Sequence, residues 1–297
     1  MTPDPTPRPT LTRRATGEPG VVIITMNRAG ELATTLDVLF DQQLSELPTV
    51  VVDNASTDGT SDVLGNHAWV QSIRVERNLG GAARNIGAEE VDTEFVAFLD
   101  DDTWPEPDAL VRAVAHLRAH PHVAVVAAHV LVGDDNRVDP ICHAMVEGAL
   151  GRVGAGYRTA GFLAGASVVR SRTLRDVGGF HPAFGVGGEE ELVAWDLLDA
   201  GWSLVYLPEF VVHHHPSPQR DPAQRRLRES RNRIWSAWMR RSVADAARRT
   251  IAEARVARRA HSLAALGRAV LRGLPMLVRE RRRLTRATES MLRDLEA

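Results

Sequence analysis

The sequence predicts an α/β fold in which helices flank a mostly parallel sheet, followed by an arginine-rich helical extension at the C-terminus. Short apolar runs, each the length of a buried strand, alternate with amphipathic helical segments through the first half of the chain. Such alternation implies right-handed crossovers between parallel strands. From residue 225 onward the chain carries 20 arginines against 7 acidic residues, whereas the rest has 16 basic against 31 acidic residues.

The 297 residues suffice for one large α/β domain with an appendage, and the content of 44% apolar and 25% charged residues is ordinary for a globular protein. We expect a disordered tail over residues 1–19, because this segment is rich in Pro, Thr and Arg and has almost nothing apolar to bury. The domain follows over 20–220 and the basic helical extension over 221–297. No run approaches the roughly 18 apolar residues of a membrane span. The single cysteine, Cys142, permits no internal disulfide, so we expect a soluble, cytoplasmic protein.

Continuous apolar runs in the first half predict strands at residues 21–25, 50–52, 70–75 and 95–99. Helices are expected over 30–43, from about residue 60, and over 82–90. In the first helix Leu32, Leu36 and Leu39 share one face.

The second half is less regular. Strands are expected at residues 123–132, 162–169, 203–207 and 210–212, with an irregular segment over 134–156. A helix over 189–200 places Leu192, Trp195 and Leu198 on its inward face. The C-terminal extension has a helical pattern that is broken near Gly273 and Pro275.

Three loops follow parallel strands and should open at one edge of the sheet, where ligands bind in open α/β folds. They begin after Thr25, at Asp53 and at Asp100. In the last of them Asp100, Asp101 and Asp102 are adjacent, and three neighbouring carboxylates are costly unless a cation neutralises them. Mg²⁺ or Mn²⁺ suits such oxygen ligands, with Asp100 and Asp102 as the pair that reaches the metal. The alternative is a helix cap and a solvated turn.

The loop at Asp53 offers a nucleotide contact. A carboxylate there can accept hydrogen bonds from a base or from ribose hydroxyls, as the acidic residue does in dinucleotide-binding folds. The alternative is an Asx-turn, and for the neighbouring Ser56 and Asp58 we favour that turn and the capping of the next helix.

Gly80 and Gly81 precede the start of a predicted helix. Backbone without side chains can approach a ligand closely there, and a helix N-terminus favours anions. Arg84 and Asn85 follow on the first turn, where they either contact donor phosphate or sugar, or pair with the acidic loops.

Two further groups carry chemistry in the second half. Acidic residues 189–191 open the helix that ends at Gly201, and the helix dipole both explains acids at that position and would keep one of them ionised as a base. Three histidines, His213, His214 and His215, follow a predicted strand. Because histidine is the commonest transition-metal ligand, we expect one of them to join the metal site.

Taken in order, these segments resemble glycosyltransferase family 2, whose members have the Rossmann-like GT-A fold. The matching segments are VIITMNR (22–28), VVDNASTDGT (51–60), NLGG with ARN and a further Gly (78–87), and FLDDDT (98–103). GGF (178–180), the acidic pair at 189–190, AGW (200–202) and PE (208–209) before the histidines complete the series. The resemblance covers about residues 21–215.

The resemblance implies a role for each candidate residue. Thr25 and Asp53 stand at the nucleotide contacts, and the rest of the nucleotide-sugar site corresponds to Asn27, Arg28, Asn54, Gly80, Gly81, Arg84, Asn85 and Asp101. Asp100 and Asp102 are the two ends of the DxD metal motif, and His214 matches the late metal ligand. The family's acidic pair is usually Glu-Asp, so Glu190 stands at the position of the catalytic base, with Glu189 as the neighbouring alternative.

The function implied is an inverting, Mn²⁺- or Mg²⁺-dependent glycosyltransferase. It would move a hexosyl or deoxyhexosyl group from a UDP- or dTDP-sugar to a hydroxyl of a glycan, glycolipid or small acceptor, in cell-surface glycan or glycolipid synthesis. One rival is a sugar nucleotidyltransferase, although residues 26–30 poorly match the glycine-rich basic loop that such enzymes would need. A second is a non-catalytic nucleotide-sugar-binding protein that retains the fold.

The basic extension leaves three interpretations open. Arginine-rich amphipathic helices with Trp235 and Trp238 can lie on an anionic membrane surface, here the inner face of the plasma membrane. They can equally pack on the acidic body or form a homodimer contact. Nucleic-acid binding is disfavoured by the acidic body and by the absence of a known binding module.

Overall fold

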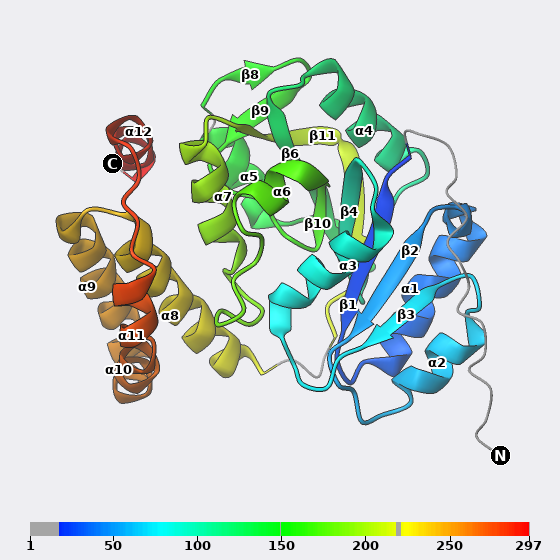
Figure 1. Cartoon of the computed structure of the whole chain (residues 1–297), viewed down its shortest axis with the longest axis horizontal. Helices are drawn as coiled ribbons and strands as arrows, with labels where there is room; N and C mark the ends of the chain where they lie inside the picture. Colours follow the sequence, from blue (N-terminus) through cyan, green and yellow to red (C-terminus); the bar gives the residue numbers. More distant parts are fainter. Residues whose placement is uncertain (1–17, 149, 218–220, 297) are drawn as a thin grey trace.

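The computed structural model describes residues 18–148, 150–217 and 221–296, so residues 1–17 of the expected disordered tail lie outside the described part. An 11-stranded sheet forms the centre of the body, and the C-terminal helices gather on one side of it, at the left of Figure 1. The strand order is β3-β2-β1-β4-β10-β6-β11-β9-β8, with β5 beside β11 and β7 beside β6. The strands are β1 (Gly20–Thr25), β2 (Thr49–Asp53), β3 (Gln71–Arg74), β4 (Phe95–Asp100), β5 (Thr103–Pro105), β6 (Val123–Val132), β7 (Arg137–Val138), β8 (Arg152–Val153), β9 (Gly156–Thr159), β10 (Ala166–Arg170) and β11 (Ser203–His214).

The prediction of a mostly parallel sheet is confirmed. Strands β3, β2, β1 and β4 pair in parallel, and β6 pairs in parallel with β11. Strand β10 lies between β4 and β6 and is antiparallel to both. The other six strands of this series, β3, β2, β1, β4, β6 and β11, therefore run in one direction. The carboxyl ends of β1, β2 and β4 therefore meet at one edge, as the sequence implied.

The helices that connect these strands along the chain cover the sheet. They are α1 (Ala29–Asp41), α2 (Thr60–Asn66), α3 (Ala83–Val91), α4 (Ala109–Ala119), α5 (Pro140–Glu147), α6 (Ser171–Asp176) and α7 (Glu190–Asp199), with short 3₁₀ turns η1 (Leu44–Glu46) and η2 (Gly80–Ala82). The predicted inward face of α1 is confirmed, because Leu32, Leu36 and Leu39 are buried. Right-handed crossovers in the order β1-β2-β3 put α1 and α2 on one face, and the return to β4 puts α3 on the other.

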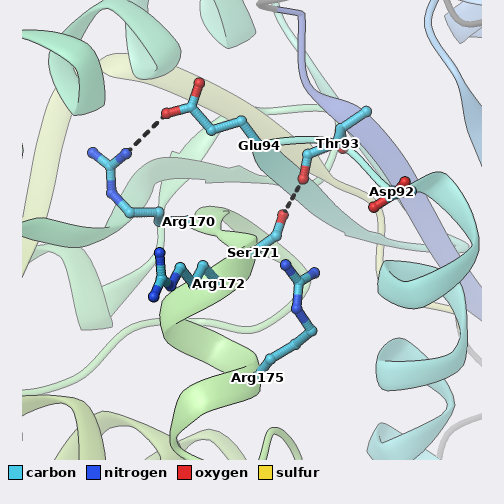
Figure 2. A pocket seen from close by; sticks show the side chains of 7 residues that line it. All are labelled: Asp92, Thr93, Glu94, Arg170, Ser171, Arg172 and Arg175. Atoms are coloured by element: carbon cyan, nitrogen blue, oxygen red, sulfur yellow. Dashed lines mark hydrogen bonds and ion pairs between the residues drawn. The ribbon is translucent and has the colours of Figure 1, made fainter.

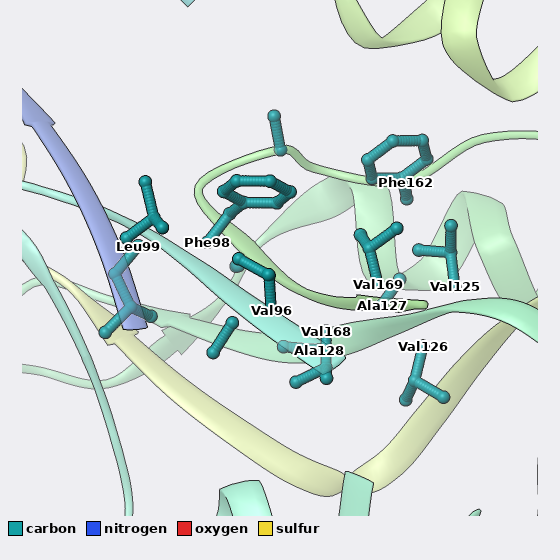
Figure 3. Packing of buried hydrophobic residues seen from close by; sticks show 14 of the residues in the cluster. Val96, Phe98, Leu99, Val125, Val126, Ala127, Ala128, Phe162, Val168 and Val169 are labelled. Atoms are coloured by element: carbon teal, nitrogen blue, oxygen red, sulfur yellow. The ribbon is translucent and has the colours of Figure 1, made fainter. Parts of the chain in front are cut away.

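The core lies along the central strands, which are covered on both faces. All residues of β1 and β2 are buried, which explains why their sequences are continuous apolar runs instead of alternating ones. Figure 3 shows Val96 and Phe98 of β4 beside Val168 and Val169 of β10, with Phe162 from the preceding loop.

Four expectations for the chain after β4 differ from the structure. The strand expected at 162–169 is β10 (Ala166–Arg170), because the chain turns at residues 164–165 before the strand begins. Helix α4 has no counterpart in the predicted set, although it is amphipathic and buries Leu110, Val114 and Leu117 against the sheet. The segment expected to be irregular contains α5, which begins where Asp139 caps Ile141 N and proline occupies the first turn. The two short strands predicted at 203–207 and 210–212 are one strand, β11, whose register shifts between Leu207 and Val211.

The C-terminal extension forms α8 (Pro222–Arg240), α9 (Val243–Arg259), α10 (Leu263–Arg272), α11 (Leu274–Arg279) and α12 (Arg286–Glu296). Trp235 and Met239 of α8 pack with Phe184 and Leu192 of the body. Arg240 makes two hydrogen bonds to Asp196 of α7, at 2.5 and 2.8 Å. One face of the extension therefore packs on the acidic body, which was one of the three interpretations. No helix in the described ranges is both long enough and apolar enough to cross a membrane.

Candidate active site

The loops after β1 and β4 are joined at the carboxyl edge of the sheet. The Thr25 hydroxyl donates to Asp101 Oδ2 at 2.8 Å, and the Thr35 hydroxyl of α1 donates to the Asp101 carbonyl at 2.8 Å. Arg28 lies 3.3 Å from Asp101 Oδ1 and 2.9 Å from Asp102 Oδ2. Burial, opposed by Arg28 and reinforced by Asp102, raises the pKa of Asp101 to about 7. The buried Asp101 carboxylate thus holds the loop after β4 against the loop after β1.

The loop after β2 is tied to its neighbours by Asp53 and Asn54. Asp53 Oδ1 accepts from Ser56 N at 2.8 Å, and Oδ2 accepts from Arg74 Nη1 at 2.7 Å. Asn54 Oδ1 accepts from Leu79 N at 3.0 Å. This is the Asx-turn alternative with an added ion pair, so a ligand contact by Asp53 would require its oxygens to be shared, and that role stays a prediction.

Asn27 joins the first loop to the second. Its backbone adopts a left-handed conformation with φ of 53°, its N–H donates to the Ser56 hydroxyl, and its side-chain oxygen accepts from Thr57 N at 2.6 Å. Asp58 Oδ1 accepts from the N–H and the hydroxyl of Thr60, the first residue of α2, although the N-cap residue is Gly59, which has no side-chain cap. Ser56, which was also expected to cap this helix, instead accepts from Asn27 N.

The glycines before α3 allow close approach, but the partner is another part of the chain. Gly80, at φ of +57°, is so close to Gly185 that an added Cβ would lie 2.4 Å from its Cα. Gly81 N donates to the Gly185 carbonyl at 3.0 Å, and a Cβ on Gly81 would lie 2.6 Å from Glu189 Oε1. The two positions therefore bring the start of α3 against the loop that precedes α7.

Arg84 is the centre of the site's charge network. Its side chain is 1% exposed; Nη2 lies 2.5 Å from Asp100 Oδ1, and Nη1 lies 2.9 Å from Glu189 Oε1. Pairing with the acidic loops, one of the two roles left open by the sequence, is the one observed. Asn85 instead exchanges two hydrogen bonds with the backbone of Phe180, at 2.8 and 2.9 Å.

The three histidines separate by strand alternation. His214 Nε2 lies 3.5 Å from Asp102 Oδ1, whereas His213 and His215 stack on the other side against Trp104 of β5. Within the described ranges no three His, Cys, Asp or Glu side chains converge as a complete metal site. The protein thus offers a carboxylate and an imidazole, while Asp100 points to Arg84.

The acidic pair at the start of α7 divides into two roles. Glu189 is buried, and both of its oxygens are engaged, with Arg84 Nη1 and with Gly187 N at 2.5 Å. Glu190 is only partly buried. Burial and the adjacent Glu189 carboxylate raise the pKa of Glu190 to about 8, against the attraction of Arg84. Of the two, Glu190 is the one whose carboxylate remains able to exchange a proton.

Two further segments complete this site, and sequence reasoning missed the second of them, helix α8. Gly165 lies so close to Asp100 that an added Cβ would be 2.3 Å from its carboxyl carbon, so the loop before β10 forms a wall of the site. Arg228 and Glu229 of α8 contact the glycine loop at residues 185–188. The only sequence signal for this contribution of α8 is the i, i+3 spacing of charged residues after Pro222, which places them on one side of the helix.

A separate hollow of about 330 Å³ lies at the opposite end of β4 and contains none of the predicted site residues (Figure 2). It is lined by Asp92, Thr93, Glu94, Arg170, Ser171, Arg172 and Arg175. Arg170 pairs with Glu94 at 3.1 Å, and the Ser171 hydroxyl donates to the Thr93 carbonyl at 2.6 Å. This hollow is a surface feature remote from the acidic loops.

Solved structures of similar fold include two glycosyltransferases. The mannosyltransferase PcManGT from Pyrobaculum calidifontis, in complex with GDP-Man and Mn²⁺, superposes with a TM-score of 0.62 over 95% of this chain and 86% of that one, at 21% identity. GalNAc-T7 with UDP, GalNAc and Mn²⁺ gives a TM-score of 0.59 over 75% of this chain and 48% of that one, at 16% identity. The GT-A fold expected from the sequence is confirmed.

The sequence relatives are glycosyltransferases. The pre-mycofactocin glycosyltransferase of Mycobacterium tuberculosis is 32% identical over 188 residues, which cover 60% of this chain and 40% of that protein. The chain thus spans two fifths of that relative's length. Glycosyltransferase AglE of Haloferax volcanii is 26% identical over 234 residues, covering 74% of this chain and 73% of the other. The model of the glycosyl transferase family 2 matches residues 20–178, more than half of the chain, and the protein belongs to that family.

Proposed function

We propose that this protein is an inverting glycosyltransferase that moves a sugar from a UDP- or dTDP-linked donor to a hydroxyl group. The observation that carries the proposal is Arg84, which joins the Asp100 loop to Glu189 inside one buried network. A donor-binding edge and a candidate base are thereby held in one site. Direct displacement at a sugar carbon needs that arrangement, because the acceptor oxygen must approach a donor that is already oriented.

The pair formed by Asp102 and His214 fits a divalent cation. The Asp102 side chain is buried and its Oδ1 lies 3.5 Å from the imidazole, so the two groups can share one ion. A carboxylate with an imidazole suits Mn²⁺ better than Mg²⁺, which prefers oxygen ligands alone, and donor phosphates would supply further oxygens. The structures of PcManGT and GalNAc-T7 contain Mn²⁺, which supports this choice of cation. When bound, the cation would neutralise charge on the departing diphosphate.

Glu190 acts in this proposal as the general base. Its carboxylate accepts the proton of the acceptor hydroxyl as that oxygen forms a bond to the anomeric carbon, while the bond to the donor diphosphate breaks. A single displacement inverts the anomeric centre and needs no covalent intermediate. Because its pKa is raised to about 8, Glu190 holds a proton near neutral pH and is a stronger base than an ordinary carboxylate once that proton has left. Arg84 fixes the neighbouring Glu189, so the segment keeps its position.

The acceptor is proposed to belong to cell-surface glycan or glycolipid synthesis, which would place the enzyme in the cytoplasm. Relatives with such names support this class: the teichuronic acid glycosyltransferase TuaG of Bacillus subtilis is 35% identical over 95 residues. The poly(ribitol-phosphate) β-N-acetylglucosaminyltransferase TarS of Staphylococcus aureus is 30% identical over 107 residues. Both matches are confined to about a third of this chain, so they support a class of acceptor and no individual one.

We also propose peripheral contact of α10 and α11 with an anionic lipid surface. Leu263, Leu271, Leu274 and Val278 recur at helical spacing and are exposed. The segment 263–279 contains three arginines and no acidic residue. A cationic, apolar stripe of this kind complements anionic lipid. A second copy placed on the same stripe would oppose arginine with arginine, which disfavours this face as the homodimer contact.

The test of the transferase proposal is a thermal-shift panel with UDP, dTDP, GDP and CDP, each with and without Mn²⁺. A ligand at a hundred times its dissociation constant adds about 2.7 kcal/mol to the free energy of unfolding. We expect Mn²⁺-dependent stabilisation by UDP or dTDP that is lost in Asp102→Asn and kept in the control His213→Gln. Stabilisation by nucleotide without turnover of any sugar would favour a binding protein. No shift with any of the four would overturn the proposed donor class.

A further inference from the structure

Helix α8 of the extension is fixed on the loop that leads to the candidate base. Asn232 Nδ2 donates to the Phe184 carbonyl at 3.1 Å and to the Gly187 carbonyl at 2.7 Å. A Cβ on Gly187, whose φ is +111°, would lie 3.3 Å from Glu229 Cγ. Because this loop continues directly into Glu189, the N-terminal half of α8 is held beside the candidate site.

Arg228 carries a positive charge here that no acidic side chain among the described residues pairs with. Its Cδ lies 3.5 Å from where a Cβ on Gly185 would be, and Gly185 in turn contacts Gly80. Across the described ranges its guanidinium makes no hydrogen bond or ion pair, and its Nε is buried. Burial and the neighbouring Arg228 cation lower the pKa of Arg231 to about 10. Two adjacent, partly buried cations are unfavourable unless an anion joins them.

Arg225 lies one turn earlier on the same helix. Its Nε donates to Glu229 Oε1 at 2.8 Å, and within the described ranges its two Nη groups make no further hydrogen bond. Burial lowers its pKa, but the charges of Glu229, Asp100 and Glu190 together raise it. Arg225 is therefore within electrostatic reach of both the acidic loop and the candidate base.

We propose that Arg225 and Arg228 form an anion-binding position at the mouth of the candidate active site, which receives the oxygens of a substrate phosphate or carboxylate. The inference rests on the proposed function, which supplies two sources for such an anion: the donor's diphosphate and an acidic group on the acceptor. The two arginines bind the anion and take no part in proton transfer. In the transfer the electron pair of the broken bond goes to the diphosphate oxygen and the acceptor proton goes to Glu190, so a fixed guanidinium favours the product charge.

The test is calorimetric titration of the full chain with three probes. They are UDP with Mn²⁺, GDP with Mn²⁺, and inorganic pyrophosphate with Mn²⁺ and no nucleotide. A second titration adds inorganic phosphate to protein saturated with a nucleoside diphosphate and Mn²⁺. The variants are Arg225→Gln, Arg228→Gln and their combination. Arg226→Gln is the matched control, because Arg226 is exposed on the same turn and loses the same charge.

A diphosphate affinity lowered about tenfold or more in Arg228→Gln, and unchanged in Arg226→Gln, assigns the position to the donor. Unchanged diphosphate affinity with loss of the phosphate signal in the saturated protein assigns it to the acceptor. Equal affinities of wild type, the double variant and Arg226→Gln for every probe overturn the inference. If wild type binds neither nucleotide, the proposed function fails, and the pyrophosphate titration still decides whether the arginine pair binds an anion.

Discussion

The acidic edge of the sheet and the basic C-terminal extension handle charge in opposite ways. At the sheet edge every buried carboxylate of the loops is held by a defined donor: Asp101 by Thr25 and Arg28, and Glu189 by Arg84. In the extension the cations are in excess. Some, such as Arg240 with Asp196, fasten the helices to the body, while Arg228 has no such partner among the described residues. The sheet edge is thus preorganised by internal pairing, whereas the unpaired charge of the extension is what our proposals assign to outside ligands.

The largest expected effect concerns Glu190. Glu190→Gln removes the proton acceptor but keeps the side-chain shape, so we expect transfer to fall by roughly 10²- to 10⁴-fold. Diphosphate binding with Mn²⁺ should remain, because no nucleotide contact is assigned to this residue. Steady-state kinetics and thermal shifts measure the two properties. Glu94→Gln, at the opposite end of β4, serves as the control. Unimpaired transfer by Glu190→Gln would show that another residue is the general base.

Arg84 tests whether the edge depends on internal pairing. Arg84→Met leaves Glu189 buried without its partner, so we expect a loss of about 3–5 kcal/mol in the free energy of unfolding. Chemical denaturation measures it, with the exposed Arg172→Met as the control. The double variant Arg84→Met with Glu189→Gln should recover part of the loss, because it removes the uncompensated charge. A single variant as stable as wild type would show that the network contributes little.

The apolar stripe tests the outward face of the extension. Replacing Leu271 and Leu274 with Glu should weaken co-sedimentation with vesicles that contain anionic lipid by about tenfold or more, since both apolar contact and charge attraction are reduced. Val111→Glu, an equally exposed apolar position on α4, is the control. Vesicles of neutral lipid should bind wild type poorly. Equal sedimentation of all variants would leave the stripe without a lipid role.

The smallest effect is a pH dependence of stability. The folded pKa of Glu190 is raised from the ordinary 4.5 to about 8, so the native state holds a proton that the unfolded state has released. The contribution of this group is thus fully present below about pH 4.5 and is lost as pH rises toward 8. Melting temperatures of Glu190→Gln relative to wild type should therefore increase across that window. A constant difference would mean that Glu190 titrates normally.

The parallel strands and the edge of the sheet that carries the candidate site followed from the sequence because both depend on local pattern, whereas the spatial order of the strands was not predicted. Fully buried parallel strands are continuous apolar runs, and the polar residues that end them must meet at one edge. This reasoning placed Asp53 and Asp100 at the carboxyl ends of two strands and Glu190 at the start of a helix, and the structure has them at the ends of β2 and β4 and at the start of α7. It missed α4, and it split β11 in two because Pro208 and Glu209 interrupt the apolar run while the strand continues through a register shift.

The contact partner of each side chain could not be predicted from the sequence. The local sequence allowed Arg84 to contact either a ligand or an acidic side chain. Glu189 comes within reach of Arg84 only because Gly81 lets the loop before α7 approach the start of α3 closely. The residue pattern alone did not distinguish the three histidines, and only the family resemblance favoured His214. The pairing of β11 with β5 decided that His214 faces Asp102 while its neighbours face Trp104.

The sequence by itself determined the α/β class, the edge at which chemistry is expected and the excess of charge in the extension, because these depend on periodicity and composition. Only the tertiary structure decided that Arg84 bridges two acidic segments and that α8 rests on the loop before Glu189. Those contacts join residues far apart in the chain, and their geometry is fixed by glycines that admit close backbone approach and by buried charges that must be paired.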